Sequence, residues 1–389
     1  MHCPPLEICE VVIDDVADDD ELTLRNHHLS QLALVCRSWV PRARFHLYRF
    51  ICIGNGTQFD SFRHSLRILP ERCSDIRLLC LWGHRDTNLK KGAIPTTRDS
   101  STKYLRDAVC TLPWRVPHLQ RLELGYLPIL HPTFIPLCSE FKAVVALSLQ
   151  HLTHQTAVEI VNIINRFPQL RTLRLVDCQW SRPSQRLPIH LPFLDDLQVE
   201  LPDVDCRRDC IGWFFPNDSK SGITKLQWSI YEPLGDELVD VLKRSPALRV
   251  ISLTAVSPKT FCGLPCLLNN VALEELEYVV CGSEIKEFIN RLSQLHQTNP
   301  PSIKGTRIMF HDQFSSVFGD ELKEDWLVVD EALKDPRLRN VNMIVFGFLD
   351  VVDPTKAENT FRSMMPSSCR RGILSCSSQT SNRHRSFML

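Results

Sequence analysis

The stretch LRTLRLVDC, residues 170–178, places leucines at positions 170, 173 and 175. Side chains two residues apart on a β-strand point to the same side, and the residue between them points to the other side. Leu173 and Leu175 would therefore face a core, and Arg174 would face away from it. The spacing predicts a short strand with one apolar side.

The same spacing recurs along the chain, so this stretch is one copy of a repeat. The other copies are IRLLCL (76–81), LQRLEL (119–124), VVALSL (144–149), LDDLQV (194–199), ITKLQW (223–228), LRVISL (248–253) and LEELEY (273–278). Their central apolar residues lie 24 to 29 residues apart after a first gap of 43, which predicts one long insertion. A period near 25 lies in the range of leucine-rich repeats, about 20–29 residues.

The segments between these strands predict helices. TAVEIVNIINRFPQL (156–170) has its apolar residues on one helical face, and Pro168 would end the helix. Segments 235–248 and 283–295 follow the same design, so neighbouring strand–helix units would stack into a continuous core. Strands within 303–310 and 341–348, with a helix at 326–338, predict atypical terminal units.

Two kinds of residue in these repeats have a predicted role outside the core. Cys178 and Cys281 follow their strands where leucine-rich repeats carry an Asn or Cys that satisfies backbone groups of the turn. The residue between the last two apolar positions is polar in seven repeats and would form a ladder, which we predict binds a target protein. A plain solvated strand face is the alternative. The seven residues are Glu123, Ser148, Arg174, Gln198, Gln227, Ser252 and Glu277.

The first 55 residues have a different pattern. PPLEICEVVIDDVA (4–17) and LSQLALVCRSWV (29–40) predict short helices whose apolar residues spread beyond one stripe. The acidic segment 18–27 predicts a loop between them. Pro41 suits either the first turn of a third helix or a break after Trp39. So small a unit cannot bury all of this apolar surface, and the remainder is expected to meet a partner or the rest of the chain.

This segment resembles an F-box, through Pro5-Leu6-Glu7-Ile8 and LALVCRSWVPRARFHLYRFI (32–51), which is similar to the hallmark of fungal F-box families. Pro4 stands at the usual leading Leu position, and the acidic loop is longer than the common pattern. The resemblance implies a three-helix domain that binds a Skp-family adaptor and, through it, a cullin ligase core. The adaptor-binding residues would be Pro5, Leu6, Ile8, Leu32, Leu34, Val35 and Trp39.

The amino-acid composition indicates which classes of partner are disfavoured and in which cellular compartment the protein is expected. Lys+Arg equals Asp+Glu at 45 each, so no net charge favours nucleic acid or an anionic membrane. No apolar run reaches the roughly 18–20 residues that a membrane span needs, and the start lacks the basic region of a secretory signal. We therefore expect a cytoplasmic or nuclear protein with reduced thiols. Five cysteines in apolar segments predict core residues: Cys36, Cys80, Cys110, Cys178 and Cys281.

The sequence predicts no active site, cofactor or metal. GNG at 54–56 lacks the third glycine of a nucleotide loop and is not expected to join a strand to a helix. The cysteine pairs Cys206/Cys210 and Cys262/Cys266 lack histidines at ligand spacing. No nucleophile stands in a recognisable elbow beside a base.

The predicted fold is α/β. Residues 1–55 form a helical F-box-like domain, 56–352 a leucine-rich-repeat-like solenoid with parallel strands on one face and helices on the other, and 353–389 a disordered tail. The resemblance implies a non-enzymatic substrate-recognition subunit of a Skp–cullin–F-box ubiquitin ligase. A leucine-rich-repeat scaffold or inhibitor with a helical cap, and an enzyme with a diffuse site, remain open alternatives.

Overall fold

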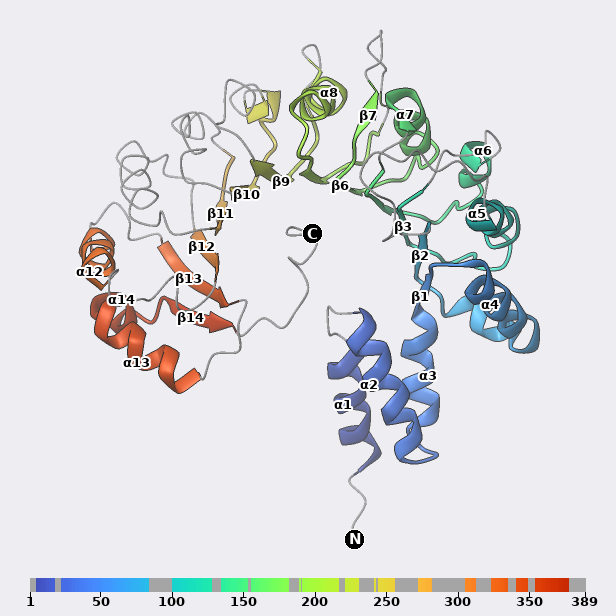
Figure 1. Ribbon diagram of the computed structural model, residues 1–389, viewed down its shortest axis with the longest axis horizontal. Coiled ribbons are helices and arrows are strands. Elements are labelled where there is room, and N and C mark those ends of the chain that lie inside the picture. Colours follow the sequence, from blue (N-terminus) through green and yellow to red (C-terminus); the bar gives the residue numbers. More distant parts are fainter. Residues whose placement is uncertain are drawn as a thin grey trace. The chain divides into compact units, whose positions relative to one another are not determined.

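The computed structural model describes residues 5–17, 22–83, 100–127, 134–152, 155–181, 189, 191–216, 221–230, 241–242, 244–255, 272–281, 305–312, 323–334, 341–348 and 354–377. The chain forms two compact units, which divide between Phe193 and Leu194. We call them unit one and unit two. Each contains parallel strands joined through helices (Figure 1).

Unit one begins with three helices: α1 (Leu6–Ala17), α2 (Leu22–Val35) and α3 (Val40–Arg49). They pack around a small core of Ile13, Ala17, Leu29 and Ala43. Pro41 lies in the first turn of α3, which is one of the two alternatives predicted for it. The loop predicted at 18–27 is shorter than expected, because α2 already begins at Leu22.

The strands of unit one are β1 (Phe50–Ile53), β2 (Leu78–Trp82), β3 (Arg121–Gly125), β4 (Ala146–Gln150) and β6 (Thr172–Val176). Each pairs with the next in parallel register. The helices α4 (Gly56–Ile68), α5 (Ser100–Thr111), α6 (Phe134–Cys138) and α7 (Ala157–Ile164) lie on one side of these strands (Figure 1). A 3-10 helix (Pro70–Ser74) precedes β2, and β5 (Gln155–Thr156) pairs with β7 (Trp180–Ser181). The predicted domain boundary at residue 55 is displaced, because β1 already belongs to the sheet.

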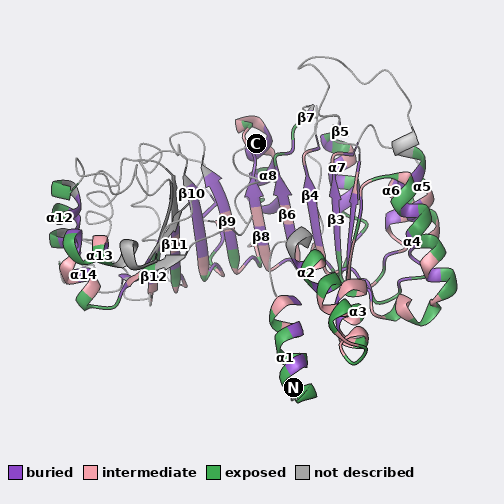
Figure 2. Ribbon diagram, turned by 60° about the horizontal axis from the view of Figure 1, so that its bottom comes forward, coloured by how far each residue is buried: buried purple, intermediate pink, exposed green. Residues whose placement is uncertain are grey.

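Helix α7 shows how the repeat pattern becomes structure. Thr156 and Glu159 form a capping box at its start, which satisfies two free N–H groups of the first turn. The side chains that sequence spacing placed on one face are buried: Ala157, Ile160, Val161, Ile164 and Phe167. Opposite them, Leu173 and Leu175 of β6 are completely buried. In Figure 2, strands β3, β4 and β6 appear buried over most of their length.

Unit two has the strands β8 (Asp196–Glu200), β9 (Lys225–Ile230), β10 (Val250–Ala255), β11 (Glu275–Cys281), β12 (Gly305–Asp312), β13 (Val341–Phe348) and β14 (Leu374–Ser377). Neighbours in this order pair in parallel. Its described helices include α8 (Val204–Phe214), α12 (Lys323–Ala332), α13 (Pro354–Met364) and α14 (Pro366–Arg370). The helix predicted within 283–295 lies outside the described residues, as does half of the segment 235–248.

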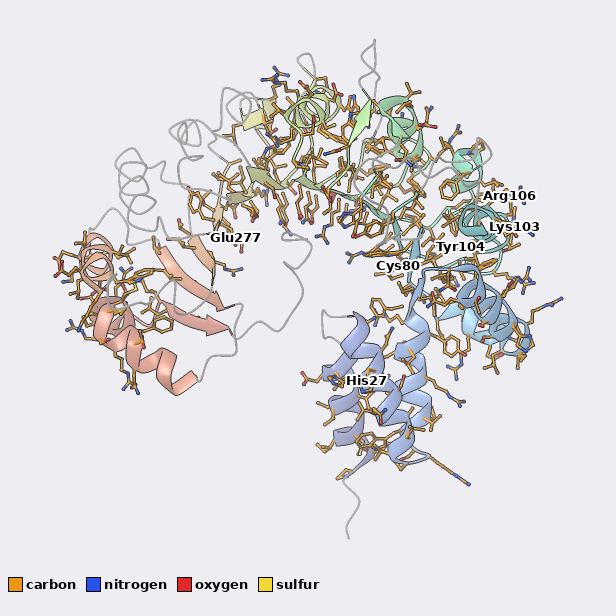
Figure 3. The ribbon with its side chains drawn as sticks, viewed as in Figure 1. His27, Cys80, Lys103, Tyr104, Arg106 and Glu277 are labelled. Atoms are coloured by element: carbon orange, nitrogen blue, oxygen red, sulfur yellow. The ribbon has the colours of Figure 1, made fainter. Side chains whose placement is uncertain are left out.

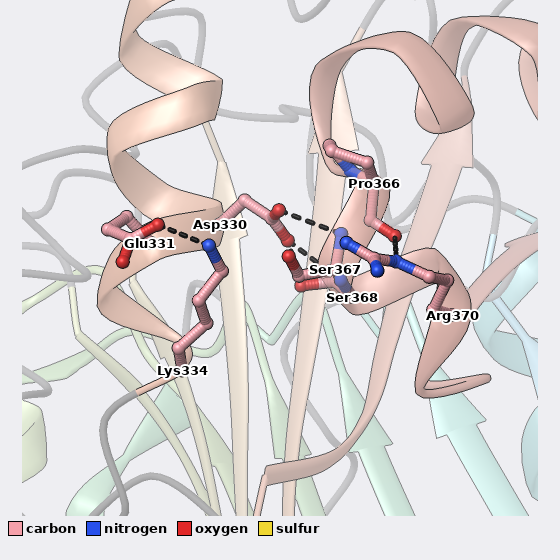
Figure 4. A network of polar contacts seen from close by, with 7 residues as sticks. All are labelled: Asp330, Glu331, Lys334, Pro366, Ser367, Ser368 and Arg370. Atoms are coloured by element: carbon pink, nitrogen blue, oxygen red, sulfur yellow. Dashed lines mark hydrogen bonds and ion pairs between the residues drawn. The ribbon is translucent and has the colours of Figure 1, made fainter.

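The prediction of a disordered tail at 353–389 is wrong for residues 354–377. These residues form α13, α14 and β14, and β14 adds a parallel strand beside β13. Asp330 on α12 accepts hydrogen bonds from the backbone N–H groups of Ser367 and Ser368 and from the Ser368 hydroxyl, at 2.6–2.8 Å (Figure 4). This carboxylate caps the start of α14 and so joins the terminal segment to unit two.

Candidate functional site

The three N-terminal helices leave an apolar surface exposed. By i, i+3, i+4 spacing, Ile8, Val11 and Val12 lie on one side of α1, away from the buried Ile13. At the end of α2, Leu34 is 79% exposed and Val35 is 62% exposed. We call the exposed aliphatic residues of this region, Leu6, Ile8, Val11, Val12, Leu34 and Val35, the helical apolar surface. Single exposed aliphatic residues are ordinary, but a group of six on two short helices is typical of an interaction surface.

The seven predicted adaptor-binding residues differ in their exposure to solvent. Pro5, Leu6, Ile8, Leu34 and Val35 are exposed. Leu32 and Trp39 are instead partly buried against the core of the three helices, so their main contacts are internal. Val11 and Val12 are also exposed, although neither was among the predicted adaptor-binding residues.

An ion cluster holds α1 against α3 beside this surface. Asp14 accepts hydrogen bonds from Arg42 Nε at 2.7 Å and Arg42 Nη2 at 2.5 Å, and its Oδ1 lies 2.8 Å from His46 Nε2. The hydrogen bond from Arg42 lowers the pKa of Asp14 to about 2, with His46 and the Arg42 charge acting in the same direction. The pair fixes the crossing of two helices that share only a small core.

Within each unit, the residues of the predicted polar ladder lie opposite one another on neighbouring strands. Glu123, Ser148 and Arg174 are direct partners on β3, β4 and β6 of unit one. In unit two, Gln198, Gln227, Ser252 and Glu277 are partners on β8 to β11, and Arg307 of β12 continues the row. These side chains alternate with buried apolar neighbours, which confirms the predicted alternation.

The ladder is not a uniformly solvated face. Glu123, Ser148 and Ser252 are buried, whereas Arg174, Gln198, Gln227 and Glu277 are partly exposed. Polar groups shielded from water need partners, and several partners lie beside the ladder or on it. Arg121 Nε lies 3.1 Å from Glu123 Oε1, Gln150 Nε2 donates to Ser148 Oγ at 2.9 Å, and Arg307 Nη1 lies 3.3 Å from Glu277 Oε1. Figure 3 labels Glu277 in unit two.

A column of side chains at the strand ends of unit one was missed by sequence reasoning. Tyr126, His151 and Asp177 directly follow β3, β4 and β6, and all three have left-handed backbones with φ of 47° to 52°. The rings of Tyr126 and His151 stack with centroids 4.3 Å apart, Trp82 packs against Tyr126, and His151 Nδ1 lies 2.8 Å from Asp177 Oδ2. A left-handed backbone costs about 1–2 kcal/mol for each non-glycine residue. The ring stacking and the His151–Asp177 contact within the column have to offset that backbone strain.

The sequence gives one signal for this column, which is that each of its three residues comes just after a predicted strand. Sequence reasoning examined the residues after each strand for Asn or Cys, and Cys178 does play that role: its Sγ donates toward the carbonyls of Leu149 and Val176 at 3.3 Å. Of the other cysteines predicted in the core, Cys80 is buried, Cys36 is partly exposed and Cys110 is exposed. The side chain of Cys281 lies outside the described residues.

The GNG segment corrects one prediction. It does join a strand, β1, to a helix, α4. Two of the backbone N–H groups that could meet a phosphate already have partners, because Asn55 Oδ1 accepts from Gln58 N at 2.9 Å and Gln58 Oε1 accepts from Gly54 N at 2.7 Å. Phe59, where a third glycine would stand, is buried. The segment is a helix cap.

Within the described part of the chain, no group of three or more His, Cys, Asp or Glu side chains is placed to hold a metal ion. No helix among the described residues is long and apolar enough to cross a bilayer. Cys206 and Cys210 are buried on α8, and His27 and His28 are exposed on α2.

Comparison with known proteins adds no family: no family model matches the chain, and no curated protein matches it significantly.

Proposed function

We propose that this chain is the substrate-recognition subunit of a Skp–cullin–F-box ubiquitin ligase. The helical apolar surface would bind the adaptor, and the polar ladder would bind a target protein. One observation carries the proposal: six exposed aliphatic side chains surround a small helical core, in the segment whose sequence resembles an F-box.

The physical argument concerns the free energy of burying these side chains. Each fully buried aliphatic side chain contributes about 1.5–3 kcal/mol, so a partner that covers several of them gains substantial affinity. The bidentate Asp14–Arg42 pair holds α1 and α3 in place before binding, which reduces the entropy lost on association. A preformed apolar helical surface suits a partner that contributes its own apolar helices.

The proposed role needs no active site in this chain. The receptor would hold a target near a charged ubiquitin carrier, so that transfer becomes nearly intramolecular. Irregular leucine-rich repeats would supply the target-binding surface, and the period near 25 and the strand–helix units of both halves support that interpretation.

An alternative function is a leucine-rich-repeat scaffold whose helices only cap the sheet. One observation favours it: α3 runs directly into β1, and the Arg25 guanidinium of α2 lies 3.9 Å from the centre of the Phe50 ring on β1. A cap of this kind explains the buried side of the helices but leaves Leu34 and Val35 without a role.

The deciding experiment is to co-express the full chain with a Skp-family adaptor and to measure the complex by size-exclusion chromatography and calorimetry. The proposal expects a stable one-to-one complex. Absence of binding by the folded chain would leave the scaffold as the better function.

A further inference from the structure

Three side chains form a row across the first three strands of unit one. Cys52 of β1 is the register partner of Cys80 of β2, and Cys80 is the register partner of Glu123 of β3. The Sγ of Cys80 donates a hydrogen bond to Glu123 Oε2 at 3.2 Å. Neighbouring strands lie about 4.7–4.9 Å apart, within the Cα separation of roughly 4.4–6.8 Å that a disulfide spans.

The two thiols have different surroundings. Cys52 lies on the edge strand β1 and is exposed, whereas Cys80 is completely buried (Figure 3 labels Cys80). A hydrogen bond from Cys80 lowers the pKa of the Cys52 thiol. The same hydrogen bond, burial and the nearby Glu123 charge raise the pKa of Cys80 well above its ordinary value. Cys52 is thus the accessible thiol that ionises more easily, and thiolates are the reactive form of cysteine.

We propose that Cys52 and Cys80 form a two-cysteine oxidation site that a hydroperoxide converts into a disulfide. Cys52 is the thiol that attacks the hydroperoxide, Cys80 resolves the product, and Glu123 takes the proton that Cys80 loses. Each role follows from one observation: the exposure of Cys52, the register of Cys80 with it, and the hydrogen bond from Cys80 to Glu123.

The chemistry proceeds in two steps. The Cys52 thiolate attacks the outer oxygen of the hydroperoxide, an S–O bond forms, the O–O bond breaks, and the alcohol leaves after gaining a proton. Cys80 then transfers its proton to Glu123 and attacks the sulfenic acid at Cys52. The S–S bond forms, the S–O bond breaks, and hydroxide leaves as water with that proton. Two thiols and one hydroperoxide become one disulfide, one alcohol and one water.

Oxidation would alter the polar ladder directly. Glu123 is the first rung predicted to bind the target, and Cys80 is one of its hydrogen-bond donors. Once Cys80 is part of a disulfide, Glu123 loses that donor and its buried carboxylate becomes less well satisfied. This consequence for target capture rests on the proposed function, but the oxidation itself does not.

Hydrogen peroxide is the probe that tests the site in the full-length chain. After brief exposure, the remaining thiols are alkylated, and peptides are mapped by mass spectrometry. The expected result is a Cys52–Cys80 peptide pair joined with the loss of two hydrogens. Cys110, an exposed cysteine of α5, is the internal reference and should react more slowly than Cys52.

Three variants assign the roles. Cys52→Ser should lose the cross-link and leave Cys80 reduced. Cys80→Ser should leave a sulfenic acid at Cys52 that dimedone traps. Glu123→Gln should form the same sulfenic acid at least as fast as the wild type, because the Glu123 charge raises the pKa of Cys52, but should convert it to the disulfide more slowly. This variant keeps the test valid if Cys80→Ser fails to fold. A wild-type chain that stops at oxidised Cys52, or one in which Cys110 reacts first, would overturn the proposal. Adaptor binding measured on the same samples reports on the proposed function separately.

Discussion

Asp14 of α1 and Arg42 of α3 form a bidentate ion pair across the helical domain, with N···O distances of 2.7 and 2.5 Å, and His46 approaches the same carboxylate. The two partners are 28 residues apart in sequence. Their contact sets the angle between two helices whose shared apolar core is small, so it bears on the helical apolar surface that we propose binds the adaptor.

The first prediction concerns the stability that this pair contributes. The pKa of Asp14 is lowered from 3.8 to about 2, so its contribution is present above about pH 4 and is lost as the pH falls towards 2. Both side chains are more than a third exposed, and solvent screening limits the effect of Asp14→Asn to about 1 kcal/mol. Melting curves by circular dichroism between pH 2 and 5 should show the two proteins converging at the acid end. Asp60→Asn, which removes an exposed pair with Arg63, is the control and should have almost no effect.

The second prediction concerns adaptor binding. The double variant Leu34→Asp and Val35→Asp places two charges on the most exposed part of the helical apolar surface, so calorimetry should show loss of adaptor binding. The matched control is Leu327→Asp with Val328→Asp, a second exposed Leu-Val pair, which lies on α12 of unit two (43% and 47% exposed). Equal loss of binding in both double variants would count against the helical apolar surface as the docking site.

The third prediction concerns the polar ladder. Glu277→Arg breaks the exposed pair with Arg307, and adding Arg307→Glu restores a pair with its charges exchanged. Both proteins should keep their stability to within about 1 kcal/mol, since exposed ion pairs contribute little. If the ladder recognises the target, both should capture less of it in pull-downs with the proteasome blocked. Unchanged capture by the exchanged pair would show that the sign of these charges does not matter. Glu123 is a poorer choice for such a test, because it is only 7% exposed and a reversed charge there would be buried.

The fourth prediction concerns the terminal segment 354–377. Burial raises the pKa of Asp330, but hydrogen bonds from Ser368 and Ser367 outweigh it and leave the pKa lowered, so the carboxylate stays charged at neutral pH. Asp330→Ala removes the cap of α14 and should cost about 2–3 kcal/mol of local stability. Hydrogen exchange should then rise in α13, α14 and β14. Glu331→Ala, one residue further along the same helix and on an exposed pair with Lys334, should leave exchange unchanged.

Much of the local structure was predictable from the sequence because it depends on near neighbours in the chain. The strands around Leu122, Leu147, Leu173, Leu226 and Ile251 were confirmed, since alternation of apolar residues requires only a strand and a core. Helix α7 and the first turn of α3 were confirmed for the same reason: a capping residue, a proline and an apolar stripe act within one or two turns.

Other features depended on contacts between distant residues, and the pattern of the sequence could not show them. Residues 354–377 lack clear periodicity, yet they fold because Asp330, more than thirty residues earlier, binds the start of α14. Leu32 and Trp39 were predicted on the docking surface, but they pack against the internal core because of how the three helices cross. The column of Tyr126, His151 and Asp177 exists only because successive strands end side by side.

The sequence by itself determined the strand–helix repeat, the polar side of the strands and the excess of apolar residues near the start, because each follows from the order of side chains along one segment. Only the tertiary structure decided which of those apolar residues stay exposed, which rungs of the ladder are buried, and that Cys52, Cys80 and Glu123 lie in one row. The physical reason is that exposure and proximity depend on the packing of segments that the chain connects through dozens of intervening residues.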